Sequence, residues 1–111
     1  METFNYLESL ECTERALLSC ILIAPHLMVD TVSEIRAEMF STPRYGFAFE
    51  AMTQLYRHGE QLDLITLNNE MRIINEAHWR ATGGAKPLHE ALTQNLSLEA
   101  FPQYVREVKH A

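Results

Sequence analysis

The side chains best suited to metal chemistry in this sequence are its histidines. They are His26, His58, His78, His89 and His110. Two histidines on one helix share a metal ion when they stand three or four residues apart, because that spacing places both rings on one face. No two of these histidines have this spacing, and the sequence contains neither His-Glu-x-x-His nor Cys-x-x-Cys. We interpret them as surface or boundary residues and expect no metal site.

The two cysteines, Cys12 and Cys20, are the candidates for thiol chemistry. On a single helix their separation corresponds to about 12 Å along the axis. The Cα atoms of a disulfide lie within about 7 Å of each other. We therefore predict two reduced thiols that act as small apolar side chains.

Acid–base catalysis by carboxylates would require a buried, coupled pair. Glu34 and Glu38 have Arg36 between them, which is the pattern of the solvent-exposed stripe of an amphipathic helix. The sequence also lacks the Gly-x-Ser-x-Gly motif that carries an activated serine. We expect no catalytic residue, and we predict that this chain is not itself an enzyme.

A phosphate-binding loop is the remaining motif that would carry chemistry. It needs a glycine-rich turn that ends in Gly-Lys-Ser/Thr, with the lysine for the phosphates and the hydroxyl for magnesium. None of the glycines, at positions 46, 59, 83 and 84, is followed by lysine. We expect this chain to bind neither ATP nor magnesium in that way.

Composition and charge point to a protein-docking role. The chain has 111 residues, of which 47% are apolar and 22% charged, and its formal net charge is −6. These are the values of one small globular domain. Nucleic-acid surfaces need clustered Lys and Arg, and the nine basic residues here are scattered. We expect no strong direct binding to nucleic acid.

The N-terminal residues and the hydropathy pattern predict a cytoplasmic location. Glu2, Glu8 and Glu11 stand where a secretory signal would be basic and then apolar. There is no apolar run of about 18 residues, the length that a spanning helix requires. We expect no membrane contact.

Apolar residues recur with the period of a helix along nearly the whole chain, and no segment alternates as a strand does. The predicted helical faces are Leu17, Leu18, Ile21 and Leu22; Met28, Val32, Ile35 and Met39; Tyr45, Phe49, Met52 and Tyr56; Leu67, Met71 and Ile74; Leu88, Ala91 and Leu92; and Leu98, Phe101, Val105 and Val108. The sequence therefore predicts an all-α fold of about six helices, in one domain spanning residues 1–111.

Proline, glycine and capping residues mark the ends of these helices. The prolines that stand where a helix would begin are Pro25, Pro43, Pro87 and Pro102. The Thr42 hydroxyl is predicted to cap the third helix, and Asp63 or Thr66 to cap the fourth. Gly59 and the pair Gly83-Gly84 are predicted helix breaks.

Trp79 and Arg80 lie outside the core pattern, in the segment Ile73–Thr82, which we interpret as a long connection. Aromatic and arginine side chains are favoured anchors of protein interfaces. Trp79 is therefore a candidate for partner contact, and the alternative is that its ring folds back to cover the core.

The order and spacing of several short motifs resemble the N-terminal domain of DnaB-type replicative DNA helicases. The matching segments are Thr13 to Leu22, Phe40, Phe49-Glu50-Ala51, Gly59 to Thr66, Gly83-Gly84 and Tyr104 to Val108. Three positions depart from the family pattern: Ser19 replaces a glycine, Tyr45 a histidine and Pro87 an aromatic residue. Because of Pro87, we do not transfer a primase-contact role to the Gly-Gly region.

The resemblance implies an orthogonal helical bundle that carries no catalytic residue and belongs to the collar of a hexameric helicase ring. Its expected partners are further copies of itself, as dimers and hexamers, and the primase C-terminal domain or a helicase loader. ATP and magnesium are expected only in a motor domain outside this chain. The matching positions are expected to cap, turn and pack the scaffold: Glu14, Leu18, Phe40, Phe49, Asp63, Thr66, Gly83, Gly84 and Tyr104.

Two alternatives remain open at this point. The first alternative is the helicase-binding domain of a primase, whose C-terminal domain has a similar helical fold. The second is a free-standing adaptor resembling a helicase loader. A small metal-dependent or acid–base enzyme is a third hypothesis, and no motif supports it.

Overall fold

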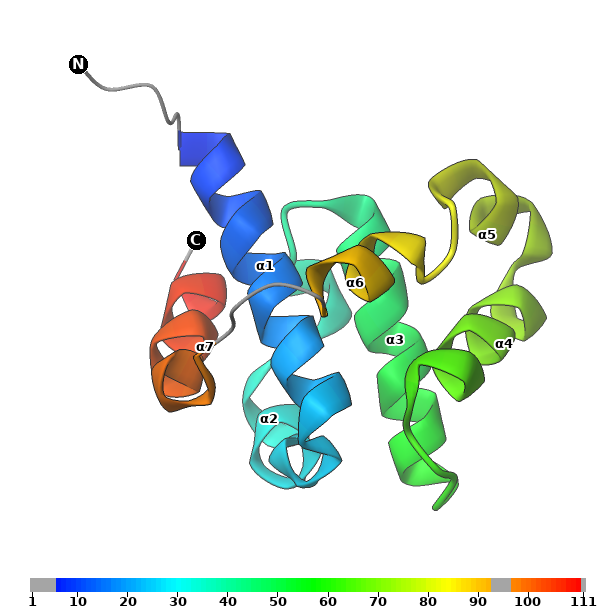
Figure 1. Ribbon diagram of the computed structural model, residues 1–111, viewed down its shortest axis with the longest axis horizontal. Coiled ribbons are helices and arrows are strands. Elements are labelled where there is room, and N and C mark those ends of the chain that lie inside the picture. The colour runs from blue at the N-terminus through cyan, green and yellow to red at the C-terminus, as the bar shows by residue number, and fades with distance from the viewer. Residues whose placement is uncertain (1–5, 93–96, 111) are drawn as a thin grey trace.

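A computed structural model describes residues 6–92 and 97–110 of this protein, with side chains from residue 9 onward (Figure 1). The helices are α1 (Tyr6–Ile23), α2 (Met28–Glu34), α3 (Pro43–Arg57), α4 (Leu64–Ile74), α5 (Glu76–Thr82), α6 (Lys86–Ala91) and α7 (Phe101–Lys109). Single 3-10 turns are η1 (Pro25–Leu27), η2 (Ala37–Met39) and η3 (Leu98–Ala100). No strand occurs in these two ranges, and the predicted all-α fold is confirmed. Glu2 and the side chain of Glu8, used above in predicting location, lie outside the described residues.

The helices pack around α1 and α3 (Figure 1). α7 lies beside α1 although the two come from opposite ends of the chain, and α6 also packs on α1. α3 contacts both α1 and α4, and α5 packs on α4. The apolar faces meet in one core, whose largest fully buried apolar side chains are Leu17, Leu18, Ile21, Met28, Ile35, Tyr45, Phe49, Met52, Leu67, Met71 and Leu88.

Most predicted helix boundaries agree with the structure. Pro43, Pro87 and Pro102 stand in the first turns of α3, α6 and α7, and Pro25 begins η1. The third helix ends just before Gly59, which has a φ of 68°. Proline fits the first turn because no intrahelical partner is available there for a backbone N–H.

The prediction of one helical face from Met28 to Met39 was wrong. α2 ends at Glu34, and Ile35 is extended, with φ −118° and ψ 140°. The chain then turns through η2, which brings the Ala37 carbonyl oxygen against Gly46; a Cβ on Gly46 would lie 2.8 Å from it. This close approach of η2 to α3 is a tertiary contact that overrides the local helical pattern.

The prediction that Ile73–Thr82 is a connection was also wrong, because it contains α5. The Asn75 side chain accepts a hydrogen bond from the His78 N–H, and Gly83 ends the helix in the left-handed conformation. With α5 there are seven α-helices in the described residues, one more than the approximate number predicted. α5 escaped prediction because its apolar pattern is weak: Trp79 is its sole large apolar residue.

The predicted cap by the Thr42 hydroxyl was wrong as well. Thr42 is the residue before α3, but its side chain makes no capping hydrogen bond. The Glu14 carboxylate from α1 accepts the Thr42 N–H instead, at 3.1 Å. The start of α3 is therefore held by a residue distant in sequence.

No single helix among the described residues is long and apolar enough to cross a membrane. The segments Ser9–Ile23 and Pro25–Glu34 pass that test only as a pair, with a bend of 115° between them.

Candidate docking surface

The candidate site lies where α4, α5 and α6 meet, and a capping box sets the start of α4. The Thr66 N–H donates to Asp63 Oδ1 at 2.8 Å, and the Asp63 N–H donates to the Thr66 hydroxyl at 2.9 Å. Two backbone donors without intrahelical partners are satisfied in this way. The box fixes where α4 begins and so which of its side chains face outward.

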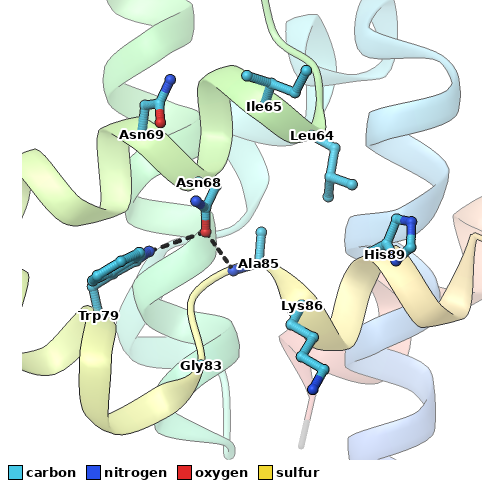
Figure 2. A pocket seen from close by; sticks show the side chains of 9 residues that line it. All are labelled: Leu64, Ile65, Asn68, Asn69, Trp79, Gly83, Ala85, Lys86 and His89. Atoms are coloured by element: carbon cyan, nitrogen blue, oxygen red, sulfur yellow. Dashed lines mark hydrogen bonds between the residues drawn. The ribbon is translucent and has the colours of Figure 1, made fainter.

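Asn68, one turn into α4, joins the three helices (Figure 2). Its Oδ1 accepts from Trp79 Nε1 at 3.0 Å and from the Ala85 N–H at 3.1 Å. A single amide oxygen therefore holds the indole of α5 and the backbone that leads into α6.

The two glycines between α5 and α6 allow this close approach. Gly83 and Gly84 have φ values of 82° and 61°, which glycine adopts without steric cost. A Cβ on Gly84 would lie 2.5 Å from both Asn68 Oδ1 and Trp79 Nε1. Gly84 is therefore required by packing as well as by backbone conformation.

A shallow cavity of about 460 Å³ opens above this cluster. Leu64 and Ile65 of α4 line one side, and Lys86 and His89 of α6 line the other (Figure 2). Ile65 is 72% exposed. The cavity thus has an apolar rim, and Lys86 is the residue with a fixed charge in its lining.

The candidate interface residues Trp79 and Arg80 differ in environment. Trp79 is half-buried against the core, its ring lies under the guanidinium of Arg72 at 5.5 Å, and part of it lines the cavity. Arg80 is exposed and pairs with Glu76 at 2.7 Å. Trp79 thus both covers the core and remains accessible from the cavity.

Glu14 is buried away from this surface and joins α1 to the start of α3. Its carboxylate accepts from the Ser41 N–H at 2.7 Å, the Ser41 hydroxyl at 2.8 Å and the Thr42 N–H at 3.1 Å. A buried carboxylate with these donors is satisfied without a cation.

The remaining sequence-derived scaffold positions lie in the core. Leu18, Phe40 and Phe49 are buried, and the rings of Phe40 and Phe49 are 5.3 Å apart. Tyr104 on α7 is partly buried against the same core. Asp63 and Thr66 cap α4, and Gly83 and Gly84 form the turn between α5 and α6.

The candidate chemical groups are dispersed. Within the described ranges no three His, Cys, Asp or Glu side chains gather to hold a metal ion. Glu34 and Glu38 lie on separate elements, not on one helical stripe as the sequence suggested, and they pair with Lys109 and Arg36. Cys12 and Cys20 are free thiols on α1, as predicted, and burial raises the pKa of the Cys20 thiol.

The residues that shape this surface, Asn68, Ile65 and Ile73, were not predicted from the sequence. Asn68 carried a signal, because asparagine inside a helix is unfavourable unless its side chain has a partner. Ile65 and Ile73 carried another, because neither falls on the buried period of Leu67, Met71 and Ile74.

Residues 7–110 match the family described as the DnaB-like helicase N terminal domain. The chain is similar to the replicative DNA helicase DnaB of Leifsonia xyli subsp. xyli (strain CTCB07), with 32% identity over 76 residues. That alignment covers 68% of this chain and 16% of the relative's length. The fold is similar to the crystal structure of the N-terminal domain of DnaB helicase from Mycobacterium tuberculosis, with a TM-score of 0.75 and 23% identity, over 88% of this chain and 69% of the other.

Proposed function

This chain belongs to the family of DnaB-like helicase N-terminal domains, and from that premise we propose that it is the non-catalytic collar domain of a replicative DNA helicase. Its role is to support assembly of the helicase ring and to dock primase or a helicase loader during DNA replication. The observation that carries this proposal is the family match, which extends over residues 7–110.

The parent protein is proposed to be an ATP-dependent helicase that acts in the cytoplasm. The alignment covers 16% of the length of the DnaB relative, and this supports the proposal that a motor, with ATP and magnesium, belongs to a segment outside residues 1–111. The chain itself is proposed to act as one domain without a cofactor.

The geometry supports docking more than catalysis. Two of the polar side chains at the α4–α6 surface hold the fold: Asn68 accepts from Trp79 and Ala85, and Asp63 accepts from Thr66. Exposed apolar side chains such as Ile65 are what this surface presents. Such a surface recognises another protein by shape and apolar contact.

The family match favours the helicase domain over the alternatives from sequence. The family and the two relatives named above are described as DnaB.

The proposal is tested with the full-length parent protein and a variant that lacks residues 1–111. We expect native mass spectrometry to show hexamers for the parent and a shift to smaller species for the deletion, because the collar contacts are lost. We also expect calorimetry to show binding of the primase C-terminal domain to the parent and none to the deletion. Unchanged assembly together with unchanged primase binding would refute the proposal.

A further inference from the structure

α5 differs from the other α-helices of the described residues in how little of it is buried. None of its side chains is fully buried, whereas each of the others has at least two buried residues. Trp79 is only partly buried against the core. The ring of His78 touches Phe47 of α3 edge to face, with centroids 4.5 Å apart. Little buried apolar area therefore opposes the separation of α5 from the domain.

The polar contacts that the structure shows between α5 and α4 lie near the surface. Trp79 Nε1 donates to Asn68 at 3.0 Å, and the Arg72 guanidinium lies 5.5 Å from the centre of the Trp79 ring. Arg72 also pairs with Glu76 at 3.8 Å, but both side chains are about half exposed, and such pairs contribute little. Arg80 pairs with Glu76 within α5 and does not tie the helix to α4.

The residues on both sides of α5 are suited to act as hinges. A single residue, Asn75, separates α5 from α4, with φ −160° and ψ 95°. On the other side, Gly83 and Gly84 both have positive φ. Glycine reaches a wide range of φ and ψ without steric cost, so α5 can move relative to α6 without backbone strain. Hinges are usually a few residues at the ends of elements that absorb such changes.

α5 is too short to remain helical once it leaves α4. It has 7 residues, and isolated helices shorter than about 12 residues are marginal in water. The hydrogen bonds within α5 therefore depend on its docking, and they break together when Trp79 leaves Asn68. Segments of this kind open as cooperative units at a lower free energy than global unfolding.

Opening of α5 would change the cavity between α4 and α6. Trp79 forms part of the lining of this cavity, and Asn68 Oδ1 lies between the Trp79 indole and the Ala85 N–H (Figure 2). When α5 leaves, the cavity loses one wall and Asn68 Oδ1 loses one of these two donors. The state of α5 thus sets the width of the candidate docking surface.

We infer that α5 is a lid on this cavity, hinged at Asn75 and at Gly83-Gly84, that opens as one unit while the rest of the domain stays folded. The inference names a means of regulating the candidate docking surface, and its functional meaning rests on the proposed docking role. The opening is a property of the chain alone, so it is tested without a partner.

The test is native-state hydrogen exchange of this chain, followed by NMR at increasing low concentrations of urea. The probes in α5 are the Trp79 and Gly83 amides, bonded to the carbonyls of Asn75 and Trp79, and the Trp79 indole N–H. The reference is the amide of Met52, a fully buried residue of α3. After correction for intrinsic rates, the α5 probes should exchange at least about 100-fold faster than Met52. Their exchange should depend little on urea, because opening exposes little surface.

A substitution far from α5 separates local opening from global unfolding. Val108, on α7, is 1% exposed and lies at the far end of the domain from α5 (Figure 1). Val108→Ala should accelerate exchange of Met52 by about tenfold or more, because buried contact is lost. It should leave the α5 probes unchanged, because α7 stays packed when α5 opens.

Substitutions on α4 test the contact that holds the lid closed. Asn68→Ala should accelerate exchange of the α5 amides by about tenfold, because the Trp79 indole loses its acceptor. Asn69→Ala is the matched control at an exposed neighbouring position and should change these rates by less than about twofold. Equal rates in the two variants would overturn the role of Asn68.

The outcomes separate the lid from the proposed function. The same urea dependence for the α5 probes as for Met52 would show that α5 opens only on global unfolding, which overturns the inference. Equal acceleration of the α5 probes and Met52 by Val108→Ala would overturn it as well. Either result, together with a parent hexamer that depends on residues 1–111, would remove the lid and leave the collar function standing.

Discussion

Phe49 is the residue at which the contribution of core packing to stability is tested most directly. Its side chain is 1% exposed and packs against Phe40. Phe49→Ala should lower the free energy of unfolding by about 3–5 kcal/mol, because apolar contact is lost and a cavity remains. Urea denaturation of this variant measures the loss. Glu50→Ala, at an exposed position on the same helix, is the control and should change stability by less than about 0.5 kcal/mol. If Phe49→Ala also changed stability by less than about 0.5 kcal/mol, the packing of α3 described here would be contradicted.

Glu14 offers a second test, on a polar residue. Glu14→Gln keeps the size of the side chain but directs an NH₂ group at donors from Ser41 and Thr42. We expect a loss of about 2–3 kcal/mol in urea denaturation, because buried donors lose a charged acceptor. Glu11→Gln is the matched control: Glu11 pairs with Arg44 at 2.7 Å in a half-exposed site, and the loss should be at most about 1 kcal/mol. Equal losses would mean that Glu14 adds nothing beyond an ordinary surface ion pair.

At the scale of helices, Gly84 in the turn between α5 and α6 is constrained both by its positive φ and by close packing. Substituting Gly59 and Gly84 in turn separates these two constraints. Gly59 and Gly84 both have positive φ, at 68° and 61°, but only Gly84 is crowded by Asn68 and Trp79. Gly59→Ala should cost about 1–2 kcal/mol from backbone strain alone. Gly84→Ala should cost about 1–3 kcal/mol more, because its Cβ forces the Trp79 indole away from Asn68.

Urea denaturation measures both losses, and the emission of Trp79, the single tryptophan of the chain, reports the indole's environment. A red-shifted emission is expected for Gly84→Ala and not for Gly59→Ala. Equal stability losses with unchanged emission would show that Gly84 matters for its φ alone.

How far the sequence predicts this fold depends on where each helix gets its stability. α1, α3, α4 and α7 were predictable because their apolar residues recur with the period of a helix. Pro43 and Pro102 also mark the starts of α3 and α7, and Asp63 caps α4. The break at Ile35 was not, because it arises from the contact between η2 and Gly46, which only the tertiary structure reveals. α5 depends on its Asn75 cap and on packing of Trp79 against α4, with little periodic signal of its own.

The candidate docking surface was predicted less well than the fold for a related reason. Trp79 was recognised as a large residue outside the core pattern, but its hydrogen bond to Asn68 joins residues on different helices. The exposure of Ile65 and Ile73 follows from which face of α4 meets α3. Sequence periodicity predicts which face of a helix is buried. What surrounds an apolar residue outside that face is known only from the tertiary structure.

For the whole molecule, the distribution of charge favours a protein over a nucleic acid as the binding partner. The chain has nine Lys and Arg residues, and among the described residues at least five of them form ion pairs with carboxylates: Arg36, Arg44, Arg72, Arg80 and Lys109. Arg72 and Arg80 share Glu76, and the other three pair with separate carboxylates elsewhere in the fold. A net charge of −6 adds a general repulsion of phosphates.

This chain should therefore not bind single-stranded DNA at physiological salt. Affinity for nucleic acid comes mainly from release of counterions as Lys and Arg neutralise phosphates. With over half of its basic residues already paired to carboxylates, the chain would have to break ion pairs to gain each phosphate contact. Fluorescence anisotropy of a labelled oligonucleotide should stay flat up to roughly 100 µM chain at ~150 mM salt, the weak end of non-specific binding. A rise that disappears on adding salt would instead reveal a basic surface, and collar docking to proteins would no longer account for the role of this domain.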